Sequence, residues 1–181
     1  MNSLSTRYAA VRQHTLKLAA PLSAEDQCVQ SMPDTSPSKW HLAHTSWFFE
    51  NVVLLPHLPS YQVFDAAFAY LFNSYYEALG PRHPRPHRGL LTRPALSQLL
   101  AFREHVNAAM QQLLLNESKL SVEALALIEL GLNHEQQHQE LLLTDALHLL
   151  SCNPLLPAYD KSFKHASASN ADLQWQTFDE G

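Results

Sequence analysis

Apolar side chains recur at spacings of three and four residues along most of the chain, which is the pattern of helices that bury one face. Long stretches rich in Leu, Ala, Gln and Glu favour helices, whereas the alternation of Val, Ile and Thr that is typical of strands is not evident. The pattern predicts helices at residues 3–19, 24–30, 36–55, 65–79, 94–115 and 121–151. We therefore expect an all-α protein in which four principal helices share an apolar face and form a bundle.

Capping residues and prolines define the expected limits of these helices. Ser36 and Ser121 are expected to accept hydrogen bonds from free backbone N–H groups, and Pro37 suits a first helical position. Gly80 suits a helix end because glycine readily adopts the left-handed conformation. The segment 80–94 contains four prolines and four arginines, so we expect a stiff Pro/Arg-rich loop there and not a regular element.

The character of the chain changes after Pro157. Ser, Ala, Asn and Lys replace the periodic apolar pattern, and the sequence finishes on Trp175-Gln-Thr-Phe178-Asp-Glu-Gly181 without a stop signal of its own. We expect a helical domain at residues 1–157 and a C-terminal linker at residues 158–181 that leads into a further domain.

Composition narrows the classes of partner. Twelve basic and seventeen acidic side chains give a formal net charge of -5 over 181 residues, which argues against broad electrostatic binding of nucleic acid or anionic lipid. No apolar run reaches the roughly 18 residues of a membrane span, so we expect no membrane partner. Two cysteines and the lack of a charged-then-apolar leader make the cytoplasm the expected location.

Two histidines of the longest expected helix, His134 and His138, lie one turn apart. At about 100° per residue they lie about 40° apart on a stripe that is otherwise mostly apolar, so both imidazoles should face the bundle interior. Burying them costs a few kcal/mol unless each ring finds a partner. Satisfied core histidines are one interpretation; the one we favour is a metal site, because a pair at i and i+4 offers two nitrogen ligands to one ion. Gln137 borders the same face.

The other polar side chains of this segment are expected to point elsewhere. We expect Glu135 and Glu140 to be ordinary charges on the helix surface, and Gln136 and Gln139 to face solvent. The segment matches the His-Glu-x-x-His signature of zinc proteases letter by letter. No downstream third ligand or substrate-binding strand accompanies that match, so it does not predict a protease.

A third ligand is expected from another helix. The segment Lys39-Trp40-His41-Leu42-Ala43-His44 is the other place where histidine lies within an apolar helical pattern. We favour His44 as the ligand because it lies deeper among aromatic residues, with His41 as the substitute. Three neutral histidines suit a redox-active iron with open coordination positions as well as a hydrolytic zinc, and ligand type alone does not choose between them.

The Pro/Arg-rich loop is a second candidate site. Arginine binds carboxylates through two hydrogen bonds, and prolines reduce the cost of ordering the loop that presents it, so Arg85 and Arg88 suit an anionic small molecule. A solvated basic loop and a nucleic-acid surface are the alternatives. The loop lacks the interleaved aromatic residues that stack on bases, which disfavours nucleic acid.

Four long stretches of the sequence together resemble a known family. They are Ser36-Pro-Ser-Lys-Trp-His-Leu-Ala-His-Thr-Ser-Trp-Phe-Phe-Glu50, Leu71-Phe-Asn-Ser-Tyr-Tyr76, Gly80-Pro-Arg-His-Pro-Arg-Pro86 and His134-Glu-Gln-Gln-His-Gln-Glu-Leu-Leu-Leu-Thr-Asp145. Over about residues 5–160 the chain is similar to the N-terminal DinB-like domain of the EgtB family of ergothioneine biosynthesis. The resemblance implies a DinB-like four-helix bundle with a three-histidine metal site.

The EgtB family consists of non-haem iron(II) sulfoxide synthases. They use O2 to join the sulfur of cysteine or gamma-glutamylcysteine to the imidazole C2 carbon of hercynine. By this resemblance, the implied site residues are the iron(II) ligands His44, His134 and His138, with Gln137 contacting hercynine and Arg85 and Arg88 holding carboxylates of the thiol substrate.

Members of this family also have a C-terminal domain similar to the formylglycine-generating enzyme. It supplies much of the substrate pocket and the catalytic tyrosine of well-studied members, so the resemblance implies no catalytic residue in this chain. We therefore expect the chain alone to bind metal with little or no synthase turnover. Three other readings stay open: a DinB-like zinc enzyme of thiol transfer or hydrolysis, a relative of the ovothiol and selenoneine synthases, and a non-enzymatic helical module that binds a partner.

Overall fold

The computed structural model describes residues 3–74, 80–162 and 175–179, and within these ranges the regular elements are all helical. Long α-helices and their direct continuations make up the body of the fold. The elements are α1 (Leu4–Ala19), η1 (Asp26–Cys28), α2 (Ser38–Phe48), η2 (Phe49–Leu54), α3 (Leu55–His57), α4 (Phe68–Leu71), η4 (Arg85–Leu90), α5 (Leu96–Leu114), η5 (Glu117–Lys119) and α6 (Val122–Ser151). The predicted all-α class is therefore confirmed.

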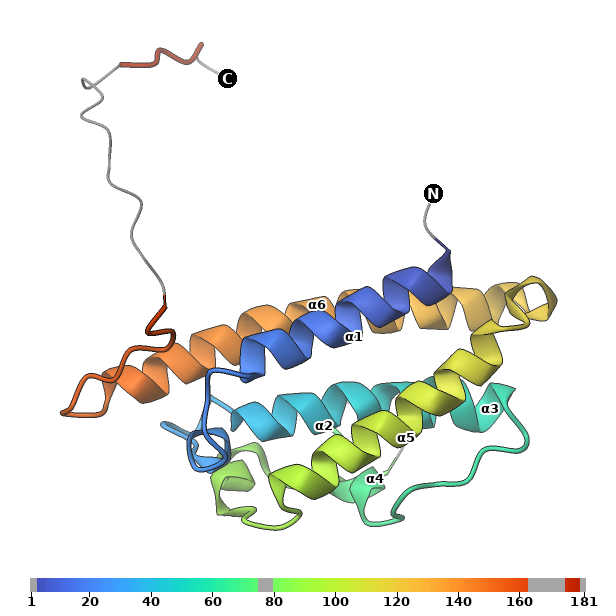
Figure 1. Ribbon diagram of the computed structural model, residues 1–181, viewed down its shortest axis with the longest axis horizontal. Coiled ribbons are helices and arrows are strands. Elements are labelled where there is room, and N and C mark those ends of the chain that lie inside the picture. Colours follow the sequence, from blue (N-terminus) through green and yellow to red (C-terminus); the bar gives the residue numbers. More distant parts are fainter. Residues whose placement is uncertain (1–2, 75–79, 163–174, 180–181) are drawn as a thin grey trace.

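Four helical rods form the body of the molecule. In Figure 1, α1 and α6 run beside each other, and α2 and α5 lie beneath them. Helix α2 packs against both α5 and α6, so it occupies the centre of the bundle and has every residue from Ser38 to Phe48 buried. This central position explains why the histidines of α2 face a neighbouring helix and not water.

Two helix starts agree with the sequence and a third does not. Ser3 and Ser121 accept hydrogen bonds from backbone N–H groups one turn later, at Thr6 and Ala124. Ser36, by contrast, caps nothing, because α2 begins at Ser38 without a side-chain cap. The hydroxyl of Ser36 is instead engaged by a distant arginine, described below.

The segments that connect the four long helices differ more from the elements predicted from the sequence. The helix expected at 65–79 is reduced to the single turn of α4, and residues 75–79 lie outside the described ranges. Within the loop expected to be irregular, the 3₁₀ helix η4 spans Arg85–Leu90. The prolines at 84 and 86 favour such a tight turn because their backbone φ is already restricted. Of the expected linker, residues 163–174 and 180–181 lie outside the described ranges, and residues 175–179 contain no regular element.

A glycine allows the two ligand-bearing helices to approach closely. A Cβ atom built on Gly131 of α6 would lie 2.6 Å from Cε1 of Phe49 and 2.9 Å from Cε1 of Phe48. Both rings are fully buried, so they have no space into which to move. The absence of a side chain at Gly131 therefore sets the spacing between α6 and the end of α2, one turn away from His134.

Glu135 lies at the centre of a buried ionic network, which corrects the expectation that it is a surface charge. It is fully buried, and its carboxylate accepts hydrogen bonds from Arg12 at 3.0 Å, from Thr15 at 2.6 Å and from Arg103. Although burial alone would raise the pKa of Glu135, the charges of Arg103 and Arg12 hold it at about 2. Gln139, expected in solvent, is also buried and donates to the Thr15 hydroxyl.

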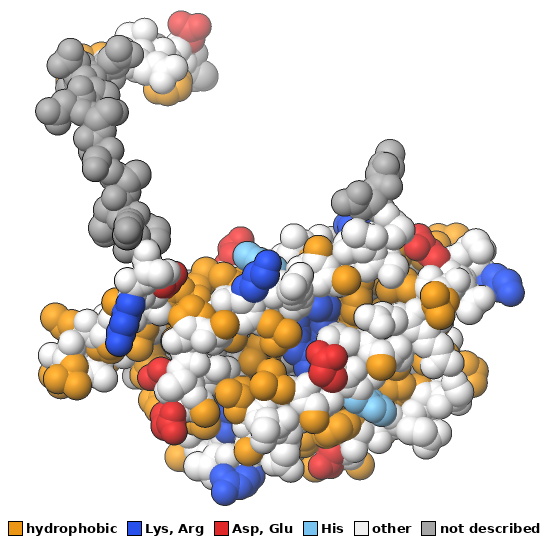
Figure 2. Space-filling model, in the orientation of Figure 1, with side chains coloured by type: hydrophobic (Ala, Val, Ile, Leu, Met, Phe, Trp, Pro, Cys, Tyr) orange, Lys and Arg blue, Asp and Glu red, His pale blue; other side chains and the backbone are white. Residues whose placement is uncertain are grey.

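One face of the molecule shows how its charged side chains are distributed. On the face shown in Figure 2, basic and acidic side chains are scattered singly among apolar ones. Among the helices of the described ranges, none combines the length and the apolar character that crossing a membrane requires.

Candidate metal centre

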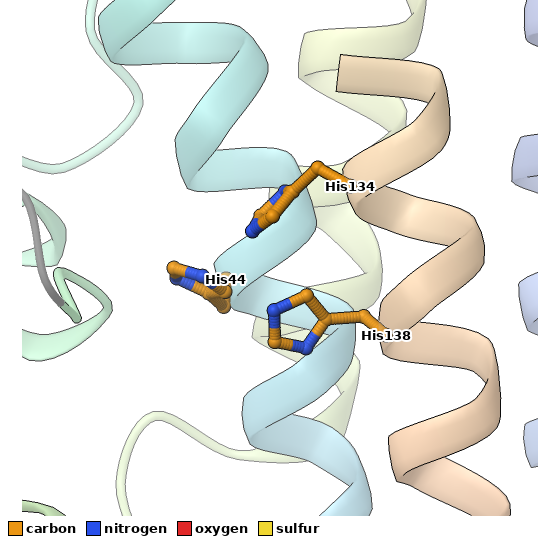
Figure 3. Close-up of side chains that lie close together, drawn as sticks. All are labelled: His44, His134 and His138. Atoms are coloured by element: carbon orange, nitrogen blue, oxygen red, sulfur yellow. The ribbon is translucent and has the colours of Figure 1, made fainter. Parts of the chain in front are cut away.

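Three imidazoles from two helices converge in the bundle interior. His44 projects from α2, and His134 and His138 project from α6 into the space between the helices, with their rings turned toward one another (Figure 3). Each contributes a ring nitrogen, and these nitrogens all lie within 4.8 Å of one another. Nitrogens bound to one ion at about 2.1 Å are at most about 4.2 Å apart. Small side-chain rotations therefore bring all three onto a single ion.

The ring of His44 is held by a hydrogen bond and by stacking. Its Nδ1 lies 2.6 Å from the carbonyl oxygen of Phe72, so Nδ1 carries the proton and donates. The ring stacks on Trp40 and Trp47, with interplanar angles of 15° and 14°. Nε2 is thereby left with a lone pair and a defined direction, as a metal ligand requires.

The two histidines of α6 are held differently. The ring of His134 packs on Phe48 at a centroid distance of 4.8 Å, and its Nδ1 is buried with no hydrogen-bond partner among the residues that the structure describes. Burying an imidazole nitrogen without a hydrogen bond destabilises the fold unless the nitrogen binds a ligand such as a metal ion. The Nδ1 of His138 lies 2.9 Å from Nδ1 of His41, which leaves Nε2 of His138 for a ligand.

The three rings are neutral near neutral pH. Burial lowers the pKa of His134 to about 4. Burial, together with the charge of the neighbouring histidines, lowers the pKa of His44 and of His138 well below the ordinary value. Because a metal ion binds the neutral form of imidazole, the site is already in its ligating state and need lose no proton.

The sequence analysis gave His41 as the substitute ligand. In the structure, His41 contacts one of the three histidines instead of joining them. It is buried, and both of its ring nitrogens are engaged: Nδ1 with His138 and Nε2 with the carboxylate of Asp145 at 3.0 Å. Burial lowers the pKa of His41, despite its hydrogen bond to Asp145. His41 therefore lies behind the ligand set and not within it.

A cavity of about 240 Å³ opens beside the three imidazoles. The site residues predicted from the sequence all line it: the three histidines of the triad, Gln137, Arg85 and Arg88. His41, the substitute ligand, also lines it, together with four residues that the sequence analysis did not assign to the site: Ser36, Trp40, Ser74 and Leu141. The volume lies below the usual range of about 300–1,000 Å³ for drug-sized ligands, so the cavity suits a small molecule or one end of a larger one.

The two arginines reach this cavity in different ways. Arg88 is buried, its guanidinium carbon lies 3.4 Å from the centroid of the Trp40 ring, and it donates to the hydroxyls of Ser36 at 2.9 Å and Ser74 at 3.3 Å. Arg85 is exposed at the rim and donates to a backbone carbonyl. A buried cation that stacks on an aromatic ring is the better prepared of the two for a carboxylate, because its orientation is already fixed.

Glu135 takes no part in the site. Both of its carboxylate oxygens accept hydrogen bonds within the buried network, so it is not available as the general base that a zinc protease would need at that position. Glu140 is exposed, as expected for a surface charge.

Comparison with known proteins shows to which protein family the chain belongs. The family model described as the DinB superfamily matches residues 7–142, which contain all three histidines of the triad. Among curated proteins, none matches the chain.

Proposed function

The chain belongs to the DinB superfamily, and from this premise we propose that it is the N-terminal, iron-binding part of a sulfoxide synthase of the ergothioneine-biosynthesis type. The reaction is the O2-dependent formation of a C–S bond between hercynine and cysteine or gamma-glutamylcysteine. The observation that carries the proposal is the presence, in one cavity, of three neutral imidazoles, an amide and a buried guanidinium.

The donor set fits an iron(II) ion. Three neutral nitrogen ligands add no negative charge and leave several coordination positions open, as a centre that must accept substrates requires. When bound, iron(II) would supply the redox chemistry and the coordination positions for sulfur and O2. Zinc would find the same three ligands, so the choice of iron rests on the resemblance of the flanking motifs to the EgtB family.

The chain's own polar residues account for recognition of the substrates. Gln137, next to the ligand His138, lines the cavity and offers an amide to the imidazole of hercynine. Arg88 presents a positive charge to a carboxylate from a fixed position on Trp40, and Arg85 adds a second cation at the rim. The cavity thus offers separate binding positions for the two groups: the arginines for the carboxylate of the thiol substrate, and the region of Gln137 and the histidine triad for the imidazole of hercynine.

The stoichiometry of the proposed reaction determines which molecules must bind close together at this site. The thiol loses its S–H hydrogen and the hercynine ring loses its C2 hydrogen, while a bond forms between sulfur and C2. O2 is reduced; one of its oxygen atoms goes to sulfur and the other leaves as water. Both organic substrates must therefore lie within bonding reach of each other, and a cavity of about 240 Å³ is too small to enclose both.

A further domain would have to complete the pocket, and we expect the chain alone to show little or no turnover. Full synthase activity of the chain with iron(II), both substrates and O2 would contradict this part of the proposal.

Substrate binding tests the proposal without turnover. Under anaerobic conditions, the iron(II)-loaded chain is titrated with hercynine and with each thiol by calorimetry. Gln137→Ala is expected to weaken hercynine binding about tenfold, since one lost hydrogen bond is worth about 1.4 kcal/mol. The matched control is Gln136→Ala, an exposed neighbour that does not line the cavity.

The same titration separates the two substrates. Arg88→Ala is expected to weaken binding of the thiol and not of hercynine, and exposed Arg93 of the same loop provides the control Arg93→Ala. Binding of neither substrate to the metal-loaded chain would overturn the proposal. Stoichiometric zinc in protein purified from cells, with no hercynine binding, would favour the zinc enzyme instead.

A further inference from the structure

A buried histidine–carboxylate pair lies directly behind the ligand His138. Nδ1 of His138 and Nδ1 of His41 are 2.9 Å apart, and Nε2 of His41 lies 3.0 Å from Oδ2 of Asp145. His41 comes one turn before His44 on α2, and Asp145 comes two turns after His138 on α6. The chain of contacts therefore runs from Asp145 on α6 through His41 on α2 to the ligand His138 on α6.

The direction of the hydrogen bonds follows from the chemistry of the groups. An ionised carboxylate can only accept, so Nε2 of His41 carries a proton and donates to Asp145. In a neutral ring the other nitrogen, Nδ1, then accepts, and the donor facing it is Nδ1–H of His138. This leaves Nε2 of His138 unprotonated, which is the form that binds a metal ion.

Asp145 is itself held in place. The same oxygen that faces His41 accepts a hydrogen bond at 2.8 Å from the backbone N–H of Ser36, just before α2. The side chains of His41 and Asp145 are only 3% and 11% exposed. An apolar pair would tie α2 to α6 without the cost of burying a carboxylate and an imidazole. A purely structural pair also has no reason to direct a nitrogen at the nitrogen of a neighbouring imidazole.

We propose that His41 and Asp145 are positioning residues of the metal centre, which hold His138 as the Nδ1–H tautomer and direct its Nε2 at the ion. This inference rests on the metal site proposed above. Outer hydrogen-bond partners of this kind fix the ring orientation of a ligand and raise its basicity, and their loss costs about 10- to 100-fold in metal affinity.

The first test measures metal affinity. Binding of Co(II) and Zn(II) to the chelator-treated chain is followed by competition with a chromophoric chelator, for wild type, Asp145→Ala and His41→Phe. We expect both variants to bind about 10- to 100-fold more weakly and the ligand-field bands of bound Co(II) to change. Asp145→Asn can keep its oxygen toward both donors, so it should recover most of the affinity lost in Asp145→Ala.

The control is Glu140→Gln, which removes an exposed carboxylate close to His138 without touching the pair. Melting temperatures without metal show that each variant is folded. Affinities for the two test variants within about twofold of wild type would overturn the inference while leaving the metal site intact.

The second test needs neither metal nor a variant of the pair. Long-range 1H–15N correlation spectra of the metal-free chain, labelled at histidine, report which ring nitrogen carries the proton, and the signals of His138 are identified by their loss in His138→Ala. We expect the Nδ1–H tautomer for His138 and the Nε2–H tautomer for His41. The Nε2–H tautomer at His138 would overturn the inference even if the metal binds. Failure of wild type to bind any metal, with the expected tautomers present, would instead count against the proposed function.

Discussion

The carboxylate of Glu135 offers the sharpest test of how this bundle is held together. Replacing it by Gln keeps the shape of the side chain but removes the negative charge that lies between Arg12 and Arg103. Both guanidiniums are buried, with side chains 3% and 1% exposed, so water cannot replace the lost charge.

Two considerations give the magnitude. Breaking a buried ion pair by removing one partner typically costs about 3–5 kcal/mol. Independently, the arginines hold the pKa of Glu135 at about 2, against an ordinary value of 4.5, and this difference corresponds to roughly 3 kcal/mol of favourable interaction with the charged form. We therefore expect Glu135→Gln to lose about 3–5 kcal/mol of unfolding free energy.

Urea unfolding in the presence of a chelator measures this loss without a contribution from bound metal. With an m-value of about 2 kcal/mol/M, the midpoint should fall by at least about 1.5 M. Glu129→Gln is a matched control: the same helix, the same residue type and an arginine partner, Arg7, but with both side chains more than 40% exposed. Water screens an exposed pair of this kind, so its loss should change stability little. Equal losses in the two variants would refute the reasoning, because it attributes the difference to burial.

Three further outcomes are expected. Gly131→Ala should lose about 1–2 kcal/mol in urea unfolding, because the gain in helix propensity of about 1 kcal/mol is outweighed by the collision of the new Cβ with Phe49; a more stable variant would contradict the packing argument. Burial raises the pKa of Glu50, although Tyr61 donates a hydrogen bond to it; its contribution to stability is therefore complete below the unfolded pKa and is lost as pH rises through the folded pKa. Glu50→Gln, which keeps an acceptor for Tyr61, should accordingly gain stability relative to wild type as pH rises from the unfolded pKa through the folded pKa, and a difference that stays constant over that rise would argue against it. Adding a divalent metal at a free concentration about 100 times its Kd should stabilise the chain by about 2.7 kcal/mol, seen as a rise of about 5–11 °C in melting temperature, and this rise should vanish in His44→Ala.

Features that depend on neighbouring residues were predictable from the sequence. The start of α6 follows from Ser121, whose hydroxyl acts within one turn. The inward direction of His134 and His138 follows from helical periodicity alone. The third histidine, His44, could be favoured because it lies among apolar residues in the same kind of pattern.

Features that depend on distant partners were not predictable in this way. Glu135 was predicted to be a surface charge because no residue near it in the sequence indicates its partners. These partners, Arg12 and Arg103, approach from α1 and α5. Ser36 has the local signature of a cap, but Arg88 and the carboxylate of Asp145 compete for its hydroxyl and its N–H group. Tertiary pairing therefore overrides local preference at the very residues that surround the candidate site.

The proposed function depends on His44, His134 and His138 binding one metal ion together. A crystal of the chain grown anaerobically with iron(II), measured on both sides of the iron absorption edge, locates the metal by its anomalous scattering. We expect one strong peak between α2 and α6, about 2.1 Å from a nitrogen of each of the three rings. A well-ordered structure with no peak there, or with iron bound only elsewhere, would contradict it.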